Sequence, residues 1–255
     1  MRSLVSTELL RLRSTRSAWI PLAAALAIAV VAVIANTSMT GHDGGMRLSP
    51  AALPGLLRAS GGQVIDGAVL LAWVVLSAGE FRYRTSVTTF LGEPNRLRVV
   101  SAKLLSAVLT GAAVGFLAEA LSAATSAAAL SAHHVPLAWS QPGVLGAVVT
   151  VPLLAALFGA LGVGLGLLLR NTAAAVGLAL MWAFVVEGIV PALTREPGIV
   201  RWLPEAAANA ALHGASPAAA LPVGVALTVL AGYAAALAGA GAALTARREI
   251  GTAIG

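Results

Sequence analysis

Three carboxylates interrupt long apolar stretches of the sequence, and they are the first residues whose type and position could do chemistry. Asp66, Glu119 and Glu187 each lie among mostly apolar neighbours. An ionisable group at the centre of a bilayer costs about 2.5–3.5 kcal/mol on insertion scales, so each should face a helix interface, a cavity or a partner. Together with Trp182 they are candidates for a substrate path that attracts a cation or an amine. The alternative is structural, with protonated carboxyls bonding across helix contacts and the tryptophan serving packing.

A second set of polar residues lies in one basic segment, residues 80–103, between two apolar stretches. Its Val87, Phe90 and Leu91 fall at i, i+3 and i+4, which predicts a short helix over residues 85–91 with one apolar face. Such a helix, with basic flanks, is suited to insert into a groove on a partner protein. The alternative is a basic loop without a partner, which would explain the arginines but not the apolar face.

The boundaries of that short helix are marked in the sequence. Thr85 favours a helix start, and Pro94 follows a glycine that favours a stop. Asn95 can then cap a new helix that leads into the next apolar stretch. The residues that we expect to contact the partner or to position this segment are Glu80, Arg82, Thr85, Val87, Phe90, Leu91, Pro94, Arg96 and Lys103.

The composition requires these residues to be positioned by membrane-spanning helices. With 58% hydrophobic residues, 10% charged residues and a mean hydropathy of +0.90, the 255-residue chain is too apolar for a soluble domain. A span needs roughly 20 mostly apolar residues. Six segments qualify, at residues 18–36, 61–79, 104–130, 143–169, 173–193 and 221–245. We therefore predict an all-α polytopic membrane protein that forms a single transmembrane domain over residues 1–255.

The basic residues predict the orientation of these spans. With the N-terminus inside, twelve Lys and Arg residues fall on the inner side and four on the outer side, which favours cytoplasmic termini. Val5, Leu9 and Leu12 lie at i, i+4 and i+7, so residues 2–16 are expected to form a helix in the inner interface, although a frayed basic tail is the alternative. The net charge of +6 is explained by this topology and by attraction to lipid headgroups, with no nucleic-acid partner.

Several kinds of active site are excluded by the sequence. The chain has no cysteine, which excludes disulfides, thiolate metal sites and cysteine nucleophiles. His133 and His134 are adjacent and would point about 100° apart on a helix, so we expect no metal site there. There is no His-Glu-x-x-His, Gly-x-Ser-x-Gly or Gly-x-x-x-x-Gly-Lys-Ser/Thr motif. We therefore predict no catalytic residue and no bound ATP in this chain.

Glycines at four-residue spacing indicate close helix packing. The pairs are Gly111 with Gly115 and Gly162 with Gly166, and each pair lies within a predicted span. Small residues at this spacing let two helix backbones approach closely. We interpret them as helix contacts and not as chemical groups.

The order of motifs resembles that of the permease subunits of ABC-2-type transporters. In that family the pattern is roughly Gly-Glu, Gly-Thr, Pro-x-Arg and Ala-Lys, and Gly79-Glu80, Thr85, Pro94-Asn95-Arg96 and Ala102-Lys103 match it. Trp202-Leu203-Pro204 before the last span and Arg247-Arg248-Glu249 at the end of the chain also resemble family motifs. The resemblance extends over nearly the whole chain in its topology.

The resemblance implies a subunit of an ATP-driven exporter. Residues 2–16 would be an interfacial elbow helix, residues 85–91 a coupling helix, and the outer segment 194–220 would carry short helices at 198–217. The expected partners are a separate ATP-binding-cassette ATPase subunit, which would hold ATP and Mg²⁺, a second permease copy or paralogue, and membrane lipids. The composition, rich in Ala, Arg and Gly, suggests a bacterial genome, so the expected location is the bacterial cytoplasmic membrane.

Three other functions remain as alternatives. An ion-coupled secondary transporter would use Glu119 and Glu187 as a proton relay, and it predicts internal repeats that the two halves of the chain do not show convincingly. A permease-like accessory or immunity protein would lack transport of its own. An intramembrane enzyme lacks any supporting motif.

Overall fold

Helices are the only regular secondary structure in the part of the chain that the structure describes. The computed structural model describes residues 2–38, 49–61, 63–82, 95–194, 197–213 and 221–247. In chain order the elements are α1 (Arg2–Ser14), α2 (Arg16–Ser38), the 3-10 turn η1 (Pro50–Ala52), α3 (Leu53–Gly61), α4 (Gln63–Arg82), α6 (Arg96–Ala132), α7 (Val144–Leu169), α8 (Thr172–Met181), the π-helical turn η2 (Trp182–Val186), α9 (Glu187–Thr194), α10 (Pro197–Val200), α11 (Pro204–His213) and α12 (Val223–Arg247).

Six helical segments among the described residues are long and apolar enough to cross a membrane, and each overlaps one predicted span. They are Ala18–Ser38, Val64–Phe81, Arg96–Ala132, Val144–Leu169, Thr172–Leu193 and Val223–Thr245. The chain is therefore a multi-pass helical membrane protein. The third segment begins at Arg96 and not at residue 104, because the Asn95 side chain accepts a hydrogen bond from the Arg98 backbone N–H at 3.1 Å and caps the helix there.

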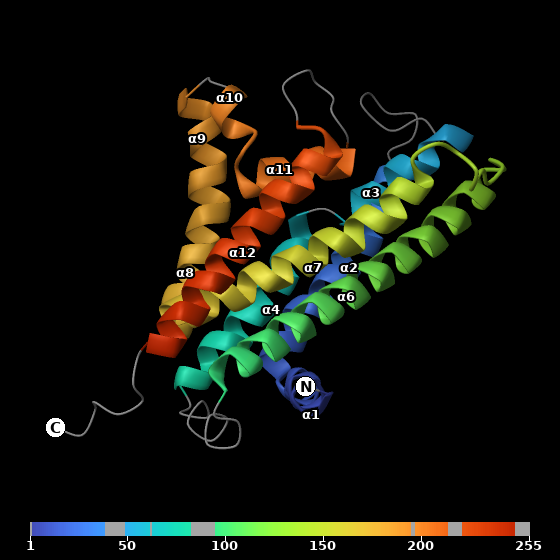
Figure 1. The fold of residues 1–255 in the computed structure, drawn as a ribbon. Coiled ribbons are helices and arrows are strands. Elements are labelled where there is room, and N and C mark those ends of the chain that lie inside the picture. The colour runs from blue at the N-terminus through green and yellow to red at the C-terminus, as the bar shows by residue number, and fades with distance from the viewer. Residues whose placement is uncertain are drawn as a thin grey trace.

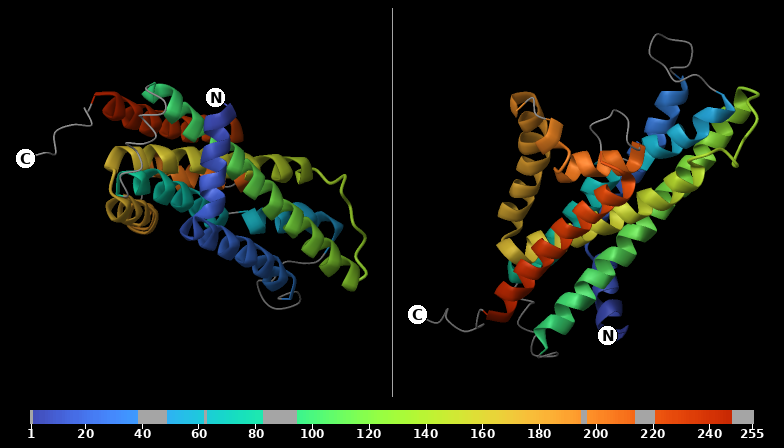
Figure 2. Two further views of the ribbon diagram at one scale, coloured as in Figure 1. Left: turned by 90° about the horizontal axis from the view of Figure 1, so that it is seen from below. Right: turned by 45° about the horizontal axis from the view of Figure 1, so that its top comes forward.

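Helix α7 lies at the centre of the bundle. It packs against α4, α6 and α12, while α2 packs against α4 and α6. Figures 1 and 2 show α1, the end of α12 and the ends of α4 and α6 that flank residues 83–94 at one end of the bundle, which we call the termini end. Helices α3, α10 and α11 lie at the opposite end, which we call the α3 end. Helix α8 contacts α4 and α7 near the termini end, whereas α9 stands away from α12 (Figure 1).

Glycines create the close contacts of α7, as the sequence spacing predicts. A Cβ on Gly111 of α6 would lie 2.4 Å from the Ala155 carbonyl oxygen of α7. A Cβ on Gly162 of α7 would lie 2.4 Å from the Leu70 carbonyl oxygen of α4, and one on Gly164 would lie 2.7 Å from the Ala238 nitrogen of α12. All three neighbours are backbone atoms, so the helices would have to separate to admit a side chain.

Gly162→Ala should therefore destabilise the bundle although alanine is the better helix former. We expect a loss of about 1–3 kcal/mol, because the added methyl group would force α4 away from α7. Gly177→Ala in α8 is the matched control, since nothing lies within 4 Å of its Cβ position. That change should be neutral or stabilising by up to about 1 kcal/mol. Thermal unfolding in one detergent checks both variants, and equal melting temperatures would contradict the packing.

Candidate functional site

Four charged side chains from three helices meet at the termini end. Lys103 of α6 donates a hydrogen bond from Nζ to Glu8 Oε1 of α1 at 2.8 Å and also to Glu80 Oε1 of α4. Arg11 of α1 donates from Nη1 to the same Glu80 oxygen. We call Glu8, Arg11, Glu80 and Lys103 the ion cluster. It joins α1 to the bundle through charged groups on both sides of the contact.

The ion cluster is almost completely removed from solvent. Lys103 is 1% exposed, and Glu8 and Glu80 are also buried, while Arg11 remains partly accessible. Removing a charged group from water is expensive unless an opposite charge and hydrogen bonds compensate for the lost hydration. Lys103 places one cation between two carboxylates, and Arg11 supplies the second positive charge. The cluster is thus balanced, with two positive and two negative groups.

A second set of contacts at the termini end holds the last turn of α12. Arg96, the first residue of α6, donates from Nη1 to the Thr245 carbonyl oxygen at 2.8 Å. Arg170 donates from Nη2 to the Leu244 carbonyl oxygen at 3.2 Å, and its guanidinium lies 4.8 Å from the ring centroid of Phe81. Cations favour the C-terminal end of a helix, where backbone carbonyls have no helical partner. Helices α4, α6, α7 and α12 are therefore linked at this end.

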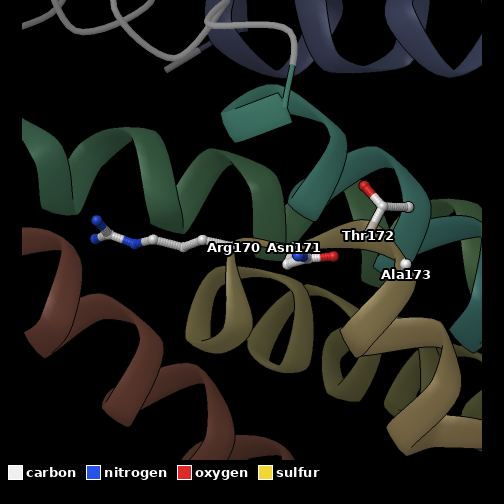
Figure 3. Close-up of a pocket in the computed structure, with 4 residues that line it drawn as sticks. All are labelled: Arg170, Asn171, Thr172 and Ala173. Carbon is white, nitrogen blue, oxygen red and sulfur yellow. The ribbon is translucent and has the colours of Figure 1, made fainter. Parts of the chain in front are cut away.

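The turn between α7 and α8 borders a hollow of about 380 Å³ lined by Arg170, Asn171, Thr172 and Ala173. Arg170 ends α7 in a left-handed conformation with φ of 53°, and the Asn171 side chain caps α8 by accepting from the Ala174 N–H at 3.1 Å. Figure 3 shows the Arg170 side chain extending to one side, while Thr172 and Ala173 lie on the other. The direction of Arg170 suits its contacts with α12 rather than a ligand in the hollow.

The predicted partner-binding residues fall partly within these contacts. The structure brings Glu80 and Lys103 together in the ion cluster and places Arg96 against α12. Arg82 is the last residue of α4. The predicted short helix, with Thr85, Val87, Phe90, Leu91 and Pro94, lies outside the described residues. Consequently, charged contacts lie within a few residues of both ends of the segment 83–94.

Glu187 has a local structural role. Its carboxylate accepts hydrogen bonds from the Glu205 N–H, at 2.9 and 2.8 Å, and from the Ala206 N–H at 3.3 Å. Trp182, at the start of the π-helical turn η2, donates from Nε1 to the same side chain at 3.0 Å. The carboxylate therefore caps the N-terminus of α11 from another helix, which satisfies its charge without a substrate.

Asp66 and Glu119 show no such bonds among the described residues. Asp66, in the first turn of α4, is buried, and its Oδ1 has no hydrogen-bond partner among the described residues. Glu119, in α6, is also buried, and neither of its carboxylate oxygens has a partner in the described part of the chain. Neither residue is hydrogen-bonded to the Trp182–Glu187 pair. Of the four candidate path residues, the described hydrogen bonds therefore join only Trp182 with Glu187, while Asp66 interacts electrostatically with Glu205, whose backbone N–H binds Glu187.

Sequence reasoning missed two members of the ion cluster, Glu8 and Arg11. The predicted apolar face of the N-terminal helix used Leu9 and Leu12, but only Leu12 is buried, and Leu9 is exposed. Glu8 and Leu12, four residues apart, form the face of α1 that meets the bundle. Glu8 is also the only acidic residue among the first 42, which was the available signal that this carboxylate has a specific partner.

Comparison with known proteins does not identify a family: neither the models of known protein families nor the curated proteins give a match to this chain.

The charge balance of the ion cluster predicts an order of effects. Lys103→Met leaves the Glu8 and Glu80 carboxylates buried together with Arg11 alone, so we expect a loss of about 3–5 kcal/mol of stability. Glu80→Gln should lower the stability by a smaller amount, because Lys103 keeps its ion pair with Glu8 and Arg11 can reach solvent. Arg13→Met removes an exposed positive charge from α1 and should change stability by less than about 0.5 kcal/mol. Thermal unfolding of the three purified variants tests this order, and a Lys103→Met protein as stable as Arg13→Met would contradict it.

Proposed function

We propose that this protein is the permease subunit of an ATP-binding-cassette exporter, in which a separate ATPase subunit docks on residues 80–103 at the cytoplasmic face. The termini end would then be the cytoplasmic end, in accord with its excess of Lys and Arg. The resemblance of the motifs in 79–103 to those of ABC-2-type permeases supports this assignment. Location in a bacterial cytoplasmic membrane, α1 as an interfacial elbow helix, and pairing with a second copy or a paralogue belong to the same proposal.

The ion cluster is the observation that carries the proposal. A docked subunit can drive transport only if movement of its docking segment reaches the spans. Residues 83–94 connect α4, which ends two residues after Glu80, with α6, which contains Arg96 and Lys103. Through these residues the segment is connected to α1 by buried ion pairs and to the end of α12 by a hydrogen bond. A displacement of the segment would therefore be passed to several helices, and not to one loop.

Ion-coupled secondary transport is the second candidate. Asp66 Oδ1 and both carboxylate oxygens of Glu119, which have no partner among the described residues, favour it, because proton or ion relays use buried carboxylates that lack fixed partners. However, the relay expected from the sequence pairs Glu119 with Glu187, and Glu187 is engaged in capping α11. An accessory or immunity protein without transport has no specific observation in its favour.

Co-purification with candidate cytoplasmic ATPases from the same operon tests the docking. We expect the native chain to retain the ATPase and a Phe90→Asp, Leu91→Asp double variant to lose it, because two carboxylates would replace the apolar face that enters the groove. The loss should be at least about tenfold in the amount of ATPase recovered.

The matched control is a Leu137→Asp, Trp139→Asp double variant. It places the same two charges on exposed apolar residues at the α3 end. It should recover as much ATPase as the native chain. Recovery that is equal for all three proteins, or absent for all three, would contradict the docking proposal.

A further inference from the structure

A buried polar stripe runs along the half of α6 nearer the α3 end. Glu119, Ser122 and Ser126 lie at i, i+3 and i+7, which places them on one helix face, and all three are at most 3% exposed. The Ser122 hydroxyl donates to the Ala118 carbonyl oxygen at 2.8 Å, whereas Ser126 Oγ and both Glu119 oxygens have no partner among the described residues. Buried polar atoms are nearly always hydrogen-bonded, so this stripe has acceptors that another group can satisfy.

Helix α3 covers this region. It contacts α2, α6 and α7 at the α3 end of the bundle (Figure 1). Its Leu53, Leu56 and Leu57 are fully buried. They pack in a small hydrophobic cluster with Leu130 of α6, which lies four residues after Ser126, and with Val144 and Ala147 of α7. This cluster is separate from the two larger ones that hold the bundle together. The apolar residues that hold α3 are therefore distinct from those of the main core.

Arg58 of α3 supplies a positive charge beside the stripe. Its guanidinium interacts electrostatically with the Glu119 carboxylate but donates its hydrogen bond from Nη2 to the Gly143 carbonyl oxygen, at 3.3 Å. Gly143 precedes α7 with φ of 95°, a conformation that glycine adopts without strain. Arg58 thus compensates part of the Glu119 charge without occupying its hydrogen-bonding positions.

We propose that Glu119 is a recognition site for the guanidinium or ammonium head of an amphipathic organic cation, with Arg58 as the built-in competitor on a lid formed by α3. A bound cation would give Glu119 the N–H donors that Arg58 does not, and the serines of the stripe would border its head group. Binding would displace Arg58, by charge repulsion, together with α3. Such cations would be the substrate class of the exporter proposed above, and in this respect the inference rests on the proposed function.

Octylguanidinium, a single guanidinium on a short alkyl chain, is the probe for this site. We expect saturable binding to the purified chain in lipid nanodiscs by titration calorimetry, after subtraction of empty nanodiscs. Glu119→Gln should abolish the saturable component. Arg58→Gln should tighten it about tenfold, because the competing charge is gone and the lid opens more readily. Octanol, which has the same chain without the charge, should show no saturable binding to any of the proteins.

Two control variants separate this site from general charge effects. Glu205→Gln removes a negative charge, as Glu119→Gln does, and Arg201→Gln removes a positive charge, as Arg58→Gln does. Both residues lie at the α3 end, outside the stripe. Both variants should bind octylguanidinium as the native chain does. Binding that survives Glu119→Gln, or that weakens in Arg58→Gln, would overturn the proposal.

The movement of α3 has its own test because the chain contains no cysteine. Leu57→Cys places a single thiol at a fully buried position of α3. Octylguanidinium should increase its labelling rate by a water-soluble maleimide severalfold, and should not do so in Leu57→Cys combined with Glu119→Gln. An unchanged rate would overturn the lid. None of these measurements needs the ATPase, so their failure would leave the docking proposal intact. Failure of the docking tests would likewise leave the cation site at Glu119 intact.

Discussion

A single ammonium group, on Lys103, lies between two carboxylates from different helices at the termini end of the bundle. Glu8 comes from α1 and Glu80 from α4, and Arg11 completes the charge balance. Each of these groups would be costly to bury alone, so the arrangement is stable only while α1, α4 and α6 keep their positions. The buried charge network therefore constrains the relative positions of these three helices. A small displacement of one helix changes the energy of its ion pairs with the other two.

The contacts of α7 give this constraint a rigid support. Gly111, Gly162 and Gly164 bring α6, α4 and α12 into backbone contact around α7. In an apolar environment, close packing of this kind replaces the hydrophobic effect as a source of helix association. At the termini end, Arg96 and Arg170 add polar links to the last turn of α12. At the α3 end, α3 packs against α6 and α7 in a smaller hydrophobic cluster.

Much of the fold follows from local signals in the sequence. Uninterrupted apolar runs predict the six spans, Asn95 predicts the start of α6, and the glycine spacing predicts the α7 contacts. The contacts of the candidate site are different, because partners far apart in the sequence determine them. Glu8 meets Lys103 across 95 positions, and Glu187 caps a helix that begins 17 residues later. No spacing rule relates such pairs, so sequence reasoning found Glu80 and Lys103 but not Glu8.

Site-specific photocross-linking tests whether an ATPase docks on the segment between α4 and α6, as we propose. A single cysteine at Phe90 of the cysteine-free chain, labelled with a benzophenone maleimide, would be irradiated in membranes that contain a candidate ATP-binding-cassette ATPase. We expect a cross-linked product with the ATPase subunit, and none from a cysteine at Leu137 at the opposite end. Cross-links from Phe90 to lipid or to this chain alone, with the ATPase present and active, would contradict the docking proposal.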